Sequence, residues 1–154
     1  LAEQKAVDVA KEMPEGTVIL GSDTVVAADG KILGKPKSHE EAYEMIRRLA
    51  GRSHQVYTGV CLVKKGPEGE ADTVVSFYDE TDVNVSPMTE KEIREYADSE
   101  EPMDKAGAYA IQGGCVIYIK EIRGEYSNVV GLPVARLYQE LSRMESNEQS
   151  ADSE

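Results

Sequence analysis

The first twelve residues place apolar and small side chains at helical spacing, which predicts a helix over residues 1–12. Pro14 and Gly16 then end this helix, because neither residue favours its continuation. Residues 17–20 are a short β-branched and apolar run that predicts a buried strand. On this prediction Asp23 lies just past the carboxyl end of the strand, at the edge of a sheet.

The next segment predicts a hairpin followed by a helix. The Asp29-Gly30 pair is a tight-turn signal between two stretches that we expect to be extended, residues 24–28 and 31–33. Ser38 precedes two glutamates, which is typical of a helix N-cap, and the helix is expected to run to about Leu49. A glycine closely follows Leu49 and suits the end of that helix.

The rest of the chain predicts two long strands and several shorter elements. Residues 55–63 and 73–85 are rich in β-branched residues, and the second run alternates between apolar and polar positions, as in an antiparallel pair. We expect a helix over residues 89–98, a strand over 115–122 and a last helix over 128–140. Helices and strands mix without strict alternation, which favours an α+β or a mixed-sheet α/β fold.

Composition indicates a single globular domain of 154 residues, in which 40% of residues are hydrophobic. Seventeen basic and 29 acidic residues give a net charge of −12, and no block of Lys and Arg forms a basic face. The sequence therefore predicts no nucleic-acid partner. A small anionic substrate remains compatible with this charge, because a few lysines in a cleft can reverse the local potential.

Cysteine usage and hydropathy point to the cytoplasm. Cys61 and Cys115 each lie among apolar residues, without a second Cys or a His at metal-site spacing, which predicts buried, reduced thiols. No run approaches the roughly 20 apolar residues that a membrane span needs, and no secretory signal is visible. Residues 144–154 are acidic and polar and are predicted to be a disordered tail.

Asp23 and two lysines are the first candidates for chemistry. At the end of a strand the Asp23 carboxylate could bind a hard cation or accept a proton from water, although a turn-forming role is the alternative. Lys35 lies between Gly34 and Pro36 and could hold a phosphate as a point charge; a solvated surface lysine is the alternative. Lys5 lies on a helix of small residues, where a lysine with a half-buried stem is the alternative.

Residues 104–113 are the second unusual stretch. The adjacent charges of Asp104 and Lys105 precede a run of small residues, which suggests a tight pocket wall. Gln112 carries a donor and an acceptor, which suits recognition of a base edge, and an ordinary turn with a structural Gln is the alternative. His39 and His54 have no nucleophile context and are assigned structural or surface roles. The sequence contains no Walker A loop and no Gly-x-Ser-x-Gly motif.

Taken together, these stretches resemble the Maf family of nucleotide pyrophosphatases, which are related to the inosine triphosphate pyrophosphatase fold. The resemblance covers the chain to about Leu141 and follows the order of the family's motifs. The matching segments are Lys5-Ala6 and residues 21–26, 32–36, 49–52 with His54, 56–60, 101–107, 111–113 and 127–133.

The resemblance implies a central mixed sheet flanked by helices and the hydrolysis of a nucleoside triphosphate to its monophosphate and pyrophosphate. It implies a divalent cation, Mg²⁺ or Mn²⁺, as the cofactor. Asp23 would match the family's proton acceptor and is also the candidate metal ligand. Lys5 and Lys35 would match lysines that neutralise the phosphates.

The resemblance also implies which substrate is bound. Thr24 and Gln112 would match positions linked to base selection, and Asp104 and Lys105 would contribute to the substrate site. Thr24 after the aspartate, with the later Asp-Lys-Ala-Gly and Ile-Gln segments, is similar to the branch that acts on dTTP and UTP. Members of the family tend to form homodimers.

Family members begin with a strand and a Ser-x-Ser-Pro-Arg-Arg loop, which has no match in this sequence. Residues 1–143 are therefore predicted to be a Maf-like domain that lacks this strand and loop. A catalytically impaired nucleotide-binding or regulatory module is the alternative function. An interaction protein that uses its acidic tail, residues 145–154, is a third hypothesis.

Overall fold

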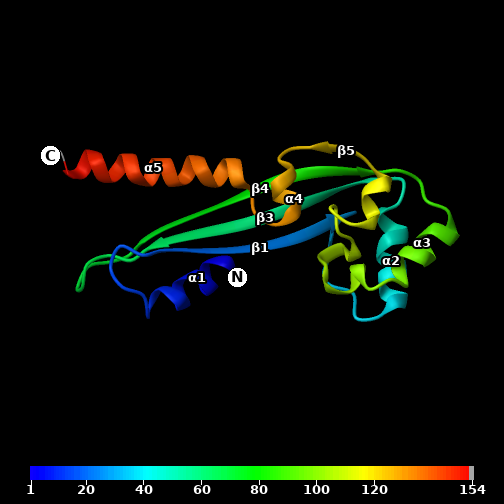
Figure 1. The fold of residues 1–154 in the computed structure, drawn as a ribbon, viewed down its shortest axis with the longest axis horizontal. Helices are drawn as coiled ribbons and strands as arrows, with labels where there is room; N and C mark the ends of the chain where they lie inside the picture. The colour runs from blue at the N-terminus through cyan, green and yellow to red at the C-terminus, as the bar shows by residue number, and fades with distance from the viewer. Residues whose placement is uncertain (153–154) are drawn as a thin grey trace.

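The computed structural model describes residues 1–152, and the side chains up to residue 147. Figure 1 shows long strands with a helix on either side at one end and a cluster of helices at the other. The helices are α1 (Ala2–Ala10), α2 (His39–Leu49), α3 (Glu90–Ala97), α4 (Tyr126–Val130) and α5 (Val134–Asp152), and three 3₁₀ helices are η1 (Glu101–Asp104), η2 (Ala106–Ala108) and η3 (Gly114–Tyr118). The strands are β1 (Val18–Ala28), β2 (Lys31–Leu33), β3 (Ser53–Lys64), β4 (Thr73–Val85) and β5 (Ile119–Arg123).

The five strands form one sheet in the order β2-β1-β3-β4-β5. The expected class, a central sheet flanked by helices, is confirmed. The sheet was expected to be mixed, whereas each pairing among the described strands is antiparallel. The hairpins β1–β2 and β3–β4 impose this direction locally, and β3 returns antiparallel to β1 after α2.

Strand β1 is longer than the sequence predicted, and the prediction that Asp23 follows the end of a strand is wrong. β1 continues without a break to Ala28, and Asp23 lies in its middle, directly opposite Gly59 of β3. Ser22 and its glycine neighbour look like turn residues in the sequence, but extended pairing with β3 overrides that local preference.

Gly21 has a packing role in this strand. A Cβ atom at Gly21 would lie 2.5 Å from the carbonyl oxygen of Ala2 and 3.3 Å from the Cβ of Ala6. Helix α1 therefore packs directly on β1 because position 21 has no side chain. Small residues of α1, among them Ala6 and Ala10, form a minor core with Ile19 of β1.

The main core lies at the other end of the sheet. Helices α2 and α3 pack there on one face of β1, β3 and β4, as Figure 1 shows at the end opposite the chain's C-terminus. Both helices begin as predicted: the Ser38 side chain accepts a hydrogen bond from the Glu41 amide, and Thr89 forms a reciprocal capping box with Glu92. Gly51 follows α2 with a φ of 72°, which suits a glycine at a helix end.

Two predicted elements differ from the structure. The strand expected over residues 115–122 is a 3₁₀ helix, η3, followed by the short strand β5. The helix expected over residues 128–140 is divided into α4 and α5, because Gly131 adopts a φ of 134° and Pro133 has no amide hydrogen to donate. Residues 119–122 are extended as predicted, but the first part of the predicted strand is wrong because an apolar run alone does not distinguish a strand from a turn of helix.

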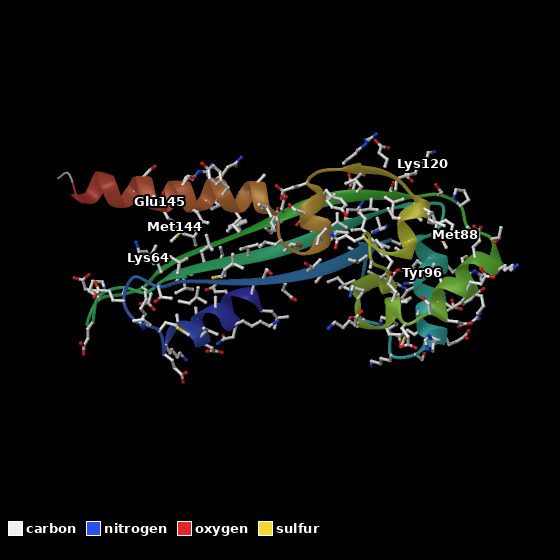
Figure 2. The ribbon with its side chains drawn as sticks, viewed as in Figure 1. Lys64, Met88, Tyr96, Lys120, Met144 and Glu145 are labelled. Carbon is white, nitrogen blue, oxygen red and sulfur yellow. The ribbon has the colours of Figure 1, made fainter. Side chains whose placement is uncertain are left out.

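The C-terminal part continues as helix. α5 extends through Asp152, over a stretch where the sequence predicts disorder, and residues 153–154 lie outside the described residues. This stretch contains neither Gly nor Pro, so nothing in it stops the helix that begins at Val134. Arg136 of α5 stacks over the ring of Phe77, which fixes the start of α5 against β4. Figure 2 shows Lys64 of β3 and Met144 of α5 toward the end of the molecule where the chain's C-terminus lies.

Cys61 and Cys115 are both buried and free, as predicted. Among the helices of the described residues, none is both long enough and apolar enough to cross a membrane.

Candidate active site

One cavity brings together five of the seven residues that the sequence singled out. Its volume is about 240 Å³, slightly below the range of about 300–1,000 Å³ typical of sites for drug-sized ligands, so it suits one part of a ligand, such as a base. The polar candidates that line it are Thr24, Lys35, Asp104, Lys105 and Gln112, and the walls include Val26, Val56, Tyr109, Ile111, Val129 and Val130.

The backbone joins the segments that carry these residues. The Gly107 amide donates a hydrogen bond of 3.1 Å to the carbonyl of Gly34, which ties the η2 segment to the loop that carries Lys35. Gly107 has a φ of 72°, and a Cβ there would lie 2.9 Å from a methyl carbon of Val26. Glycine is therefore required at this position for two reasons, its conformation and its contact with β1. Ala108 also has a positive φ, of 64°, although it is not a glycine.

The cavity is less acidic than the chain as a whole. The Lys105 ammonium lies 2.9 Å from the Asp104 carboxylate, and this hydrogen bond and charge hold the pKa of Asp104 below its ordinary value. Lys35 adds a weaker attraction in the same direction. Two ammonium groups and one carboxylate therefore give the cavity a local positive excess in a protein of net charge −12. This excess favours an anionic ligand.

A hydrogen-bond network holds the loop that carries Gln112. The Tyr96 hydroxyl donates to Glu101 at 2.6 Å and accepts from the Ala110 amide at 3.1 Å. The Glu101 carboxylate in turn accepts from the Gly114 amide at 3.1 Å. The loop is thus fixed on either side of Gln112, by Tyr96 of α3 and by Glu101 of η1, and Gln112 itself is exposed at the cavity. Figure 2 labels Tyr96.

Tyr109 is a wall residue that the sequence reasoning missed. Its hydroxyl lies 2.7 Å from Nε2 of His54, and the two rings meet edge to face. His54 is only 1% exposed, and burial lowers its pKa to about 4, so its imidazole is neutral at pH 7. Burial likewise raises the pKa of Tyr109. The structural role expected for His54 is confirmed, and no sequence signal linked it to Tyr109, 55 positions away.

Asp23 lies on the other face of the sheet. Successive residues of a strand point to opposite faces, so the Thr24 side chain enters the cavity while the Asp23 side chain faces a second hollow. The first turn of α1 forms one side of this hollow, which Glu3 also lines. Tyr57 of β3 and Ser76 of β4 also line it, and the Ser76 hydroxyl donates a hydrogen bond of 3.3 Å to the Glu3 carboxylate.

The cavity and the hollow lie on opposite faces of β1, beside an edge of this strand that is only partly paired. β2 pairs with β1 only at Val26–Ala28, so β1 has no strand partner on that side from residue 18 to residue 25 among the described residues. Asp23 and Thr24 are therefore accessible from the same edge, although they face opposite ways.

Lys5 is the candidate that the structure leaves apart. It lies on an exposed position of α1 and lines neither the cavity nor the hollow.

His39, the other histidine, hydrogen-bonds through Nδ1 to the carbonyl of Ala97, which fixes the start of α2 against α3 and agrees with the structural role predicted for it.

Few carboxylates that could bind a cation lie near the open edge of β1. Within residues 1–152, no group of three or more His, Cys, Asp or Glu side chains forms a metal-binding arrangement. Asp23 and Glu3 nevertheless line one hollow. Mg²⁺ is commonly held by one or two carboxylates together with phosphate oxygens of the substrate, and this pair fits that kind of site.

Comparison with known proteins identifies the class. The Maf family, described as Maf-like protein, matches residues 1–144, and the chain belongs to this family. A dTTP/UTP pyrophosphatase of Carboxydothermus hydrogenoformans is 53% identical over 141 residues, which are 92% of this chain and 73% of that protein. Proteins of the same name from Lachnoclostridium phytofermentans and Agathobacter rectalis are each 48% identical, over 93% and 94% of this chain and 72% and 76% of their own lengths.

Proposed function

We propose that this protein hydrolyses dTTP and UTP to the nucleoside monophosphate and pyrophosphate. The observation that carries the proposal is the convergence on one cavity of positive excess of residues from separate parts of the chain, namely Thr24, Lys35, Asp104, Lys105 and Gln112. The similarity to several proteins named dTTP/UTP pyrophosphatase supports the choice of substrate.

In the proposed complex the base occupies the cavity and the phosphates extend past the open edge of β1. Thr24 and Gln112 contact the base edge, because both offer hydrogen-bonding groups at the cavity. The ammonium groups of Lys35 and Lys105 neutralise negative charge on the phosphates, and Asp104 holds the Lys105 ammonium at 2.9 Å. Lys5, exposed on α1, is retained as a further candidate for phosphate contact.

Asp23 is the proposed general base. Its carboxylate is free of hydrogen bonds and ion pairs with the other described side chains, so it is available to accept a proton from the attacking water. A divalent cation, Mg²⁺ or Mn²⁺, would be held by Asp23 and Glu3 with phosphate oxygens, and when bound it would neutralise charge on those oxygens. We also propose that the protein forms a homodimer, and a measurement of its molar mass in solution tests this directly.

The test is pyrophosphate release by the full-length protein from dTTP and UTP, with Mg²⁺ or Mn²⁺ and in EDTA. Release that depends on the cation supports the proposal. Absence of release from both nucleotides refutes the enzymatic function. If dTTP and UTP still raise the melting temperature without turnover, the protein is a nucleotide-binding module instead.

A further inference from the structure

A chain of buried polar groups lies directly behind Thr24. The hydroxyl oxygens of Thr24 and Thr58 are 2.9 Å apart, and the Thr58 hydroxyl lies 2.9 Å from the backbone carbonyl of Asn128. Thr58 and Asn128 are completely buried, whereas Thr24 is half-buried and lines the cavity. Neither Thr58 nor Asn128 lines the cavity itself, so both act on a ligand only through Thr24.

The directions of these hydrogen bonds follow from the number of protons available. A backbone carbonyl only accepts, so Thr58 must donate its single hydroxyl proton to Asn128. The bond between the two threonines therefore needs the proton of Thr24, which donates to Thr58. With its proton committed, the Thr24 hydroxyl presents only lone pairs to the cavity and acts there as an acceptor.

Asn128 fixes this arrangement from the far side. Its side-chain amide donates to the carbonyl of Val56 at 3.1 Å and to the Thr81 hydroxyl at 2.9 Å. Thr81 in turn donates to the carbonyl of Glu125 at 3.0 Å. Because these groups are buried, breaking any of the bonds leaves a polar atom without a partner, which opposes rotation of the Thr58 hydroxyl.

The acceptor at Thr24 discriminates between pyrimidine bases. The ring N3 of uracil and thymine carries a hydrogen and is a donor, whereas N3 of cytosine has a lone pair and is an acceptor. We propose that Thr58 is a specificity-determining positioning residue, whose hydroxyl holds Thr24 as an acceptor and so selects uracil and thymine over cytosine. This inference rests on the proposed function, because it concerns the base of the substrate bound in the same cavity.

The test compares kcat/KM for UTP and CTP in the full-length protein and in two variants. Wild type is expected to prefer UTP by about ten- to a hundred-fold, since two opposed acceptors leave both atoms unsatisfied. Thr58→Val keeps the side-chain shape but releases the Thr24 proton, so the preference should fall at least about ten-fold. Thr58→Ser retains a hydroxyl and should keep the preference.

The ratio separates specificity from general damage. A purely structural role for Thr58 would lower kcat/KM for both nucleotides equally and leave their ratio unchanged, and this result would overturn the inference. A wild type without preference for UTP would overturn it as well. Absence of turnover with every pyrimidine nucleotide would instead refute the proposed function.

A second test uses wild type alone and so avoids any effect of substitution on folding. UTP methylated at N3 lacks the donor, whereas UTP methylated at C5 carries the same added group and keeps the donor. We expect kcat/KM to fall about ten- to a hundred-fold for the N3-methyl nucleotide and to change little for the C5-methyl nucleotide. Equal turnover of the two would contradict the acceptor role of Thr24.

Discussion

The two faces of β1 differ in how completely they are built. On one face Thr24 is tied to Thr58, and the loops that carry Lys35 and Gln112 are each held by hydrogen bonds. On the other face the Asp23 carboxylate makes no hydrogen bond or ion pair with the described side chains and lies in a shallow hollow beside α1. Under the proposed function, this difference means that the groups that contact the base are held in place before binding, whereas Asp23 is available for water, a cation and phosphate.

The largest expected effect concerns Asp23. Asp23→Asn removes the proposed proton acceptor while keeping nearly the same shape, and we expect kcat/KM for UTP to fall by about 10²–10⁴-fold. The rate of pyrophosphate release measures this fall in kcat/KM. Asp8→Asn, on an exposed turn of α1, makes the same change of charge and should leave the rate unchanged. A comparable rate in Asp23→Asn would remove Asp23 from the mechanism.

The next effect concerns the cavity lysine. Lys35→Ala removes an ammonium group that lines the cavity, and kcat/KM should fall about 10²-fold because developing phosphate charge loses a stabilising partner. Lys37→Ala removes the same charge two residues away, from an exposed position outside the cavity lining. Equal kinetics of the two variants would show that Lys35 contributes only to the general field.

Two glycine substitutions should each disturb one of the two faces of β1. Gly21→Ala places a Cβ 2.5 Å from the carbonyl oxygen of Ala2. Gly113→Ala places one against the Glu101 carboxylate, which must then move away from its hydrogen-bond partners Tyr96 and Gly114. Each should lower the free energy of unfolding by about 1–3 kcal/mol. Gly21→Ala should mainly lower kcat, and Gly113→Ala should mainly raise KM by moving the Gln112 loop.

The matched control for these glycines is Gly114→Ala. Its Cβ would meet its nearest neighbours at 3.7 Å, an ordinary contact, so stability should change by no more than about 0.5 kcal/mol. Chemical denaturation measures all three variants. A Gly113→Ala protein as stable as Gly114→Ala would contradict the close fit of Glu101 against the loop.

The effect expected to be smallest for activity is that of His54, which lies outside the cavity lining and acts on the pH dependence of stability. Its pKa is about 4 in the folded protein and about 6.5 in the unfolded chain, so below pH 6.5 the unfolded chain binds a proton that the folded protein does not. The stabilisation is complete above pH 6.5 and is lost progressively as the pH falls to 4, by roughly 3 kcal/mol. His54→Gln keeps a partner for Tyr109 and should lack this part of the slope.

Unfolding curves at pH 4, 5, 6 and 7 separate His54 from the carboxylates, which titrate in both proteins. The difference between wild type and His54→Gln should shrink as the pH falls. A constant difference across the range would show that the imidazole of His54 is not buried in its neutral form.

Local signals in the sequence predicted most elements of the fold. The cap at Ser38, the helix start at Thr89 and the Asp29-Gly30 turn all depend on neighbouring residues, and all are confirmed. The failures depend on distant contacts. Gly21 and Ser22 suggested a turn because the sequence does not show that α1 packs on this part of β1.

The residues of the candidate site were likewise predicted only in part from the sequence. Five candidates converge on one cavity, but their roles stay predictions, and Asp23 was expected at a strand end and lies mid-strand, facing away from that cavity. The pair His54–Tyr109 and the link from Thr24 through Thr58 join residues tens of positions apart. Such pairings arise from the register of β1 and β3 and the packing of α4, which no local pattern shows.

Binding of a non-hydrolysable UTP analogue tests most directly the division of labour between the two faces. Calorimetric titration of the full-length protein in EDTA, where no cation links Asp23 to the phosphates, should give Asp23→Asn an affinity equal to or tighter than that of wild type, because the substitution removes a negative charge near the phosphates. Gln112→Ala, on the cavity face, should bind at least about ten-fold more weakly. Loss of binding in Asp23→Asn together with wild-type binding in Gln112→Ala would contradict the account.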